Sequence, residues 1–198
     1  MRYVSLLMLG FSLSACRPAS APLQAAARPA VDNGACLPQQ RGFLRARLRG
    51  ALEADLDWKA ALIECEGGAR PDGKGIRVSL SGPLNASGQK LRIVFGLSAP
   101  PATAEARNVD TNLTLIVEGA QQLFSTLGND KCSVDDLVQR PLASAGAGGA
   151  GDYEVSARGF CVGAASTLDQ KSQVWMDRFD FTARIHLEES DVHGATRV

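Results

Sequence analysis

Histidine is scarce in this sequence, which has only His186 and His193 among its 198 residues. Nucleophilic catalysis by serine or cysteine needs a base beside the nucleophile, and histidine supplies that base most often. Alternation of side chains places His186 on the outward face of the last expected strand, and His193 lies in the C-terminal tail. Glycine-rich phosphate loops and helical zinc-ligand motifs are missing as well. We therefore expect a protein without enzymatic activity, cofactor or metal ion.

Net charge and long apolar runs are also lacking. The 21 basic residues balance 21 acidic ones, so no overall field attracts nucleic acid or an anionic surface. The apolar stretch at residues 4–13 is too short to span a bilayer. Glycine, by contrast, is abundant with 20 residues beside 9 prolines, and this content suits a turn-rich β-protein. Partners must therefore be inferred from local features.

Residues 1–16 have the features of an export signal that ends in a lipid-attachment site. Arg2 supplies a positive charge, residues 4–13 form an apolar core, and Leu13-Ser14-Ala15-Cys16 closes the segment. This ending resembles the lipobox of bacterial lipoproteins. The resemblance implies cleavage before Cys16, a diacylglycerol on its thiol and an acyl chain such as palmitate on its amine. Buried acyl chains contribute about 0.8 kcal/mol per CH₂, so the attachment would be effectively permanent.

The residue after the lipobox cysteine indicates a location. It is Arg17 rather than the Asp that is associated with retention in the inner membrane, so the resemblance implies the outer membrane, on its periplasmic side. We expect a signal peptide at 1–15, a lipidated cysteine and disordered Ala/Pro linker at 16–35, a disulfide-braced β-domain at 36–188 and a flexible tail at 189–198. The body is similar to uncharacterised secreted β-proteins of proteobacteria, and this similarity implies no mechanism.

Four cysteines remain in the mature chain: Cys36, Cys65, Cys132 and Cys161. An even number in an exported protein predicts two disulfides, for which three pairings are possible. We favour Cys36 with Cys65 and Cys132 with Cys161, because each bond then braces a neighbouring segment. A four-cysteine zinc site is less suitable, since the closely spaced pairs that such sites use are missing.

From Leu44 to Trp58 every second residue is apolar or small, and the residues between them are mostly charged. This two-residue period indicates β-structure with one buried face. The favoured interpretation is one continuous strand kinked at Gly50, and the alternatives are a hairpin turning there or a helix over 51–65. The hairpin would set three arginines against three acids: Arg45 with Asp57, Arg47 with Asp55 and Arg49 with Glu53.

The same alternation predicts further strands along the body. They cover residues 61–66, 76–80, 91–97, 113–117, 122–127, 153–161 and 175–187. The polar run up to Asp110 is expected to be a loop, and the Ser-x-x-Asp pattern at Ser133 to start one or two helical turns. Half-buried strands of this kind pair antiparallel. We expect an all-β fold of about eight strands, an antiparallel β-sandwich or a small up-and-down barrel, with at most one or two short helices.

Several residues are weak candidates for binding. Arg45, Arg47 and Arg49 form a basic row, although Glu53, Asp55 and Asp57 on the same face favour a self-neutralising surface. Arg70 lies in a turn near Cys65. Asp177 has the parity of the apolar face, where an unpaired charge is costly, so it is also the acid around which a hydrolase site would form. Trp58 and Trp175 share that inward parity, which is typical of core packing.

These features favour a non-catalytic lipoprotein of the envelope with a binding or structural role. Its partner would be an envelope protein or a small ligand, with no nucleic acid, and the lipid on Cys16 would hold it at the membrane. One alternative is a carrier of a small apolar ligand in a hollow β-barrel. Another is a carboxylate-based hydrolase around Asp177.

Overall fold

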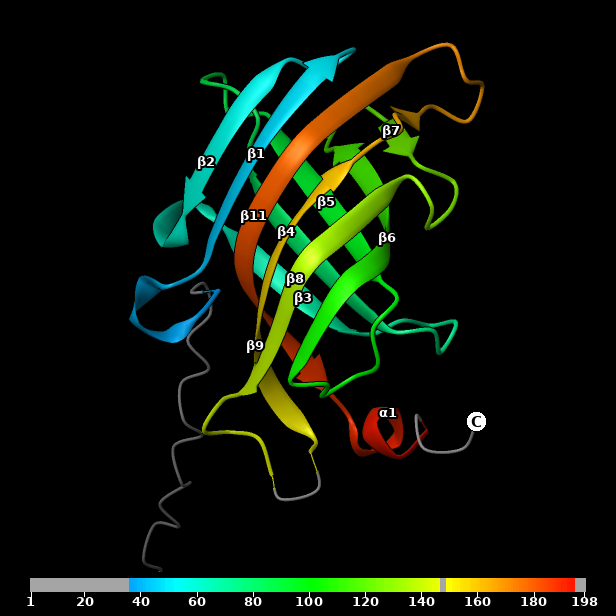
Figure 1. Cartoon of the computed structure of the whole chain (residues 1–198). Helices are drawn as coiled ribbons and strands as arrows, with labels where there is room; N and C mark the ends of the chain where they lie inside the picture. Colours follow the sequence, from blue (N-terminus) through cyan, green and yellow to red (C-terminus); the bar gives the residue numbers. More distant parts are fainter. Residues whose placement is uncertain (1–35, 147–148, 195–198) are drawn as a thin grey trace, which may run out of the picture. The chain divides into compact units, whose positions relative to one another are not determined.

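The computed structural model describes residues 36–146 and 149–194 (Figure 1). These residues form one antiparallel sheet of eleven strands and a single short α-helix, so the all-β prediction is confirmed with more strands than the eight expected. The predicted signal peptide, Cys16, the linker and the last four residues lie outside the described part. Within that part, no helix has the length and apolar character needed to cross a bilayer.

The elements have the following bounds. The strands are β1 (Phe43–Gly50), β2 (Ala54–Lys59), β3 (Glu64–Ala69), β4 (Ile76–Pro83), β5 (Lys90–Leu97), β6 (Glu105–Val117), β7 (Gln122–Ser125), β8 (Cys132–Pro141), β9 (Gly151–Cys161), β10 (Ala165–Ser166) and β11 (Gln173–Leu187). Two 3₁₀ turns, η1 (Pro38–Gln40) and η2 (Ala60–Leu62), and the helix α1 (Glu189–Gly194) complete the described chain.

The sheet is rolled rather than split into two packed sheets. Paired neighbours follow the order β3–β4–β5–β6–β8–β9–β11–β1–β2, and the strands at one end of this order cross those at the other (Figure 1). The roll closes where β3 comes beside the second half of β11. There the amide of Arg184 donates to Cys65 Sγ at 3.4 Å. The single sheet differs from the predicted two-sheet sandwich and is rolled in the manner of the predicted barrel, although no ladder joins β3 to β11 in the described residues.

Two long strands hold the roll together. The first half of β6 pairs with β8, and its second half pairs with β5 and β7. Strand β11 pairs with β9 and β10 along one edge and with β1 along the other. Each therefore belongs to more than one part of the sheet.

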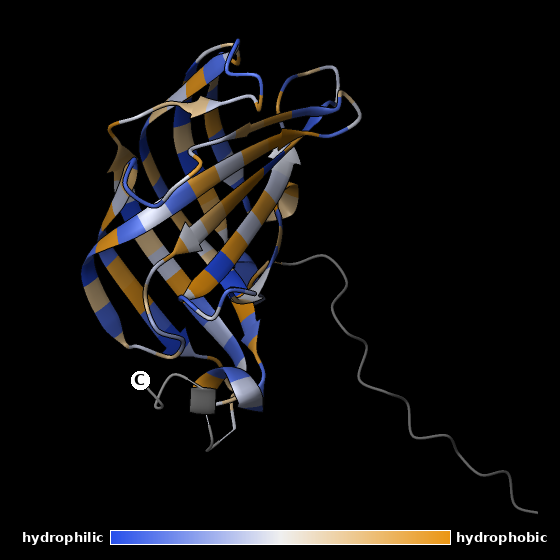
Figure 2. Cartoon of the chain, turned by 90° about the vertical axis from the view of Figure 1, so that its right-hand side faces the viewer, coloured by the Kyte–Doolittle hydropathy of each residue, from blue (hydrophilic) through white to orange (hydrophobic). Residues whose placement is uncertain are grey.

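The core lies inside the roll and is built from residues of nearly all the strands. Hydrophobic and hydrophilic residues alternate along many of the strands, as the bands in Figure 2 show. Phe95 of β5 stacks on Phe179 and Phe181 of β11, with ring centroids 4.7 Å apart in both contacts. All three rings are buried. Because aromatic pairs add to the free energy gained by burial, this cluster is a main source of stability.

The segment from Leu44 to Trp58 forms a hairpin, so the favoured continuous strand is wrong and one alternative is right. Strand β1 pairs with β2, with Arg45 opposite Asp57 and Arg47 opposite Asp55. The chain reverses after Gly50, whose φ of +103° few other residues adopt. The third predicted pair, with Glu53, does not form because Glu53 lies in the bend.

A β-bulge in β11 makes the predicted inward and outward faces wrong for the first part of this strand. Leu48 pairs with Met176 and Ala46 with Phe179, so β11 has one more residue than β1 between these positions. The extra residue reverses the two-residue period. Asp177 and Trp175 are consequently exposed rather than inward, whereas Trp58 is buried as expected.

Three further expectations are corrected. The segment after Ser133 belongs to β8 rather than to a helix, and the polar run before Asp110 already belongs to β6 from Glu105 onward. These two segments pair with each other, so both errors concern one ladder. The start of the expected tail forms α1.

Both disulfides have the favoured pairing. Cys36 is bonded to Cys65 and Cys132 to Cys161. The second bond joins two residues that face each other in the β8–β9 ladder. The first ties the entry of the chain to β3, beside the seam with β11.

Candidate functional site

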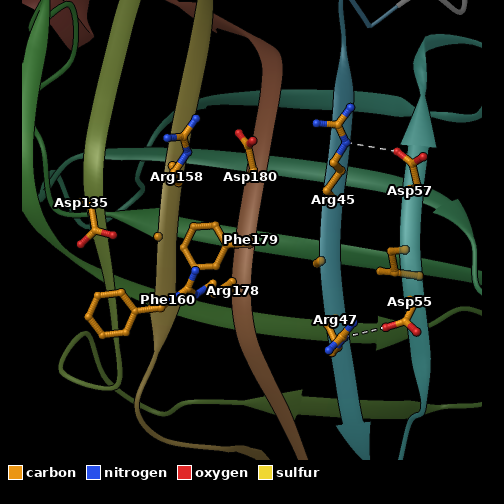
Figure 3. A pocket seen from close by; sticks show the side chains of 13 residues that line it. Arg45, Arg47, Asp55, Asp57, Asp135, Arg158, Phe160, Arg178, Phe179 and Asp180 are labelled. Carbon is orange, nitrogen blue, oxygen red and sulfur yellow. Dashed lines mark hydrogen bonds and ion pairs between the residues drawn. The ribbon is translucent and has the colours of Figure 1, made fainter.

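A groove of about 970 Å³ lies on the outer face of β8, β9, β11, β1 and β2 (Figure 3). Charged side chains of both signs line it: Arg45, Arg47, Arg158 and Arg178 with Asp55, Asp57, Asp135 and Asp180. The remaining lining comes from Phe160 and from the buried positions Ala46, Leu56, Gly159 and Phe179. Positive and negative residues are equal in number, so the groove is neutral but strongly polar.

Strand register arranges the charges in one row of alternating sign across six strands. From one edge to the other the row reads Asp57 of β2, Arg45 of β1, Asp180 of β11, Arg158 of β9, Asp136 of β8 and Arg107 of β6, each opposite the next. Opposite charges at facing positions stabilise a sheet, whereas like charges destabilise it. The row therefore favours the observed register.

The charges at the β1–β2 side of the groove neutralise one another. Arg45 Nε lies 3.4 Å from Asp57, and Arg47 Nε lies 3.0 Å from Asp55 (Figure 3). Arg49 also donates to Asp55, at 2.9 Å. The hydrogen bond from Arg49, followed by that from Arg47, holds the pKa of Asp55 below its usual value. The expectation of a self-neutralising face is thus confirmed for these three arginines.

The middle of the groove is different. Within the described residues, Arg158, Arg178, Asp135 and Asp180 form no side-chain hydrogen bond and no ion pair within 4 Å. Arg158 and Asp180 face each other in the ladder, and Arg178 faces Phe160 one step further along the same face. Two cations, two anions and the partly exposed phenyl ring of Phe160 are therefore available to a ligand.

The other predicted binding residues lie outside this arrangement. Arg49 does not line the groove, and its guanidinium is held by Asp55 and by the carbonyl of Leu48. Arg70 is nearly buried and donates to Asp72 at 2.7 and 3.1 Å, so it is not free for a partner. Asp177 is exposed in the bulge and is not among the groove residues.

His186 does not line the groove. His186 Nδ1 lies 2.8 Å from Asp152, towards the end of β11 that is remote from the bulge. The side chain of His193 is outside the described residues. Across the described chain, no three His, Cys, Asp or Glu residues are arranged to hold a metal ion.

The sequence did not predict that the charged residues in the middle of the groove form a site. Alternation places Arg158, Arg178 and Asp180 on the outward face, and this placement is correct. What brings them together is the pairing of β9 with β11, in which Arg158 lies opposite Asp180 and Phe160 lies opposite Arg178. Asp135 is the extra residue of a second bulge, between Val134 and Asp136 of β8, which leaves Asp135 and Asp136 both exposed. The sequence contains no local signal for either event.

Comparison of the chain with protein-family models, with curated proteins and with solved structures finds no match, so its function has to be inferred from the groove itself.

Proposed function

We propose that this chain is a lipid-anchored protein of the outer membrane, on its periplasmic side, whose β-domain binds an envelope protein in the groove without chemical conversion. The lipobox at Cys16 supports the anchor. Two disulfides in a small domain support an oxidising compartment, because cytosolic thiols are kept reduced.

The observation that carries the binding role is the set of unpaired charges in the groove. Arg158 and Arg178 offer planar donors that match carboxylates, and Asp135 and Asp180 offer acceptors for amines. A peptide segment that contains both acidic and basic side chains can satisfy both signs at once. The phenyl ring of Phe160 adds apolar contact area beside them.

The apolar-carrier alternative draws no support from the interior. A carrier needs an apolar hollow large enough for its ligand. The centre of the roll is instead occupied by the stacked rings of Phe95, Phe179 and Phe181. A binding role on the outer face is therefore the better proposal.

A photo-crosslinking amino acid in place of Phe160 tests the groove in cells. We expect a specific crosslinked protein from this position and none from the same substitution at Leu62, which is exposed on η2 away from the groove. Adding Arg158→Ala and Arg178→Ala should reduce the product at least tenfold, since each lost charge-assisted hydrogen bond costs about 1.5–3 kcal/mol. Equal crosslinking from both positions, or a product insensitive to the arginines, contradicts the proposal.

The anchor is tested separately by Cys16→Ser and membrane fractionation. We expect the variant to leave the membrane fraction because it can no longer accept a lipid. Unchanged membrane association contradicts the anchor and leaves the groove experiment unaffected.

A further inference from the structure

Exposed apolar side chains gather at one end of the β-domain, which we call the apolar end. It consists of Leu123 of β7, Leu127 after β7, Val162 after β9, Leu168 between β10 and β11, and Trp175 of β11. Phe160 of the groove borders it. Among the described large apolar residues that are exposed, only Leu62 lies elsewhere. Such clustering marks interaction surfaces, whereas single exposed apolar residues are ordinary.

Strand pairing shows why these segments converge. The short strand β10 joins β7 to the start of β11, with Ser166 opposite Ser125 and Ala165 opposite Val174. The amide of Val162 donates to the carbonyl of Lys131 at 2.8 Å, which holds the segments after β7 and after β9 together. All of them meet near the upper end of the molecule in Figure 1.

The side chains protrude instead of lining a pocket. Leu168 is 80% exposed in a tight turn that the amide of Gln170 closes on the carbonyl of Thr167. Val162 is 68% exposed and Leu127 59% exposed. Leu127 also has a φ of +56°, a strained conformation for a bulky residue, and such strain is typical of functional positions.

The turns at the apolar end carry no excess of positive charge that would attract an anionic surface. Asp130 stands beside Lys131, and Asp169 lies 3.8 Å from Lys171. Acidic and basic residues therefore cancel in both turns. Apolar contact is therefore the main interaction that these two turns offer.

The length of the tether permits contact with the bilayer. About 20 residues separate Cys16 from Cys36, and they reach about 65 Å when extended. The chain enters the sheet at Phe43, and the eight residues of β1 rise about 27 Å to Gly50, which pairs with Val174 beside Trp175. The tether is thus more than long enough for the apolar end to turn towards the membrane.

We propose that the apolar end inserts shallowly into the lipid bilayer to which the chain is anchored. The proposal rests on the lipid anchor of the preceding section. A bilayer accepts protruding apolar side chains without a complementary pocket for each of them, which a protein partner would need. The indole of Trp175 suits the boundary between acyl chains and water, because its ring is apolar and its N–H is polar.

The two tryptophans provide a direct test. The lipidated full-length mature chain is reconstituted through its lipid into phosphatidylcholine vesicles, with or without bromine on the acyl chains as a quencher. We expect a blue-shifted Trp175 emission that bromine quenches, unchanged by high salt. The Trp175→Phe variant reports Trp58 alone, which is 2% exposed and should not be quenched.

Leu168→Asp together with Val162→Asp should shift the equilibrium between inserted and free orientations at least roughly tenfold towards the free one, and so remove most of the quenching. Leu62→Asp is the matched control and should leave quenching unchanged. A lipidated chain whose Trp175 is not quenched, or whose quenching survives the double substitution, overturns insertion while leaving the anchor intact. A Trp175 shift that requires added envelope proteins overturns it in favour of a protein partner. A mature chain without lipid on Cys16 overturns the anchor and this proposal together.

Discussion

Glu154 is a buried carboxylate whose environment makes a strong prediction. Its side chain is 7% exposed, bonded to Arg41 and 3.9 Å from Arg140. Without Arg41 this buried carboxylate would lose its hydrogen-bonded partner and keep only the longer contact with Arg140, which compensates its charge poorly. We expect Arg41→Ala to lower the free energy of unfolding by about 1–3 kcal/mol in urea titrations. The matched substitution Arg45→Ala, whose pair with Asp57 is exposed, should cost about 0–1 kcal/mol. Equal losses would contradict the role given to Glu154.

The lowered pKa of Asp55 predicts how stability depends on pH. Its pKa is lowered mainly by the hydrogen bond from Arg49 and next by that from Arg47. A lowered pKa in the folded state means that its contribution to stability is complete above the ordinary value of about 3.9 and is lost as pH falls through the lower folded value. Asp55→Asn should therefore lose less stability than the parent on acidification below about pH 4. Parallel curves of unfolding free energy against pH would contradict this expectation.

At the scale of elements, the β1–β2 hairpin depends on Gly50. A Cβ there would lie 2.6 Å from the carbonyl oxygen of Gln173, and its φ is +103°. We expect Gly50→Ala to cost about 3 kcal/mol or more, measured by thermal or urea unfolding. Gly73→Ala is the control: its φ is +68°, but nothing lies within 4 Å of the added Cβ, so about 1–2 kcal/mol is expected. A Gly50 variant no less stable than the Gly73 variant would show that the close approach to Gln173 is unimportant.

Elements with an unbroken two-residue period could be predicted from the sequence. Strands β4, β5 and β9 were predicted in this way, because apolar inward residues alternate with mostly polar or small ones along each of them. The period failed at Asp177, where one inserted residue reverses the faces and exposes Trp175. A bulge leaves no local mark in the sequence, since it depends on the partner strand.

The β6–β8 ladder and the groove could not be predicted from the sequence, for a related reason. The first half of β6 is mostly polar, and its apolar residues Ala106 and Val109 lie opposite Leu137 and Val134 of β8. These four apolar residues, spread over two segments, give too weak a periodic signal to predict either strand. The groove requires knowing that Arg158 faces Asp180, which is a matter of register. Register is set by contacts between distant segments and cannot be derived from alternation alone.

At the scale of the whole molecule, the two disulfides should differ in effect although both span 29 positions. The loss of loop-closure entropy is the same for both and accounts for about 3–4 kcal/mol each. Cys132 and Cys161 face each other in a ladder that persists without the bond. Cys36–Cys65 instead supports the seam between β3 and β11, which no ladder joins in the described residues.

Replacing Cys36 and Cys65 by Ser should therefore increase amide hydrogen exchange in β3 and in the end of β11, beyond the global loss of stability. Replacing Cys132 and Cys161 by Ser should increase the exchange of the β8–β9 amides only as much as the fall in global stability requires. Native-state hydrogen exchange measures both. The same exchange pattern in the two double variants would contradict a special role for the seam.

The sharing of β6 and β11 among different neighbours has a consequence for cooperativity. A subdomain can melt by itself only if its strands can separate from the rest, and here each long strand would have to break its ladders on both sides. Heating should thus give a single calorimetric transition whose van't Hoff and calorimetric enthalpies agree. A nick in a surface turn should yield fragments that remain associated, since neither fragment contains a complete set of partners for both strands.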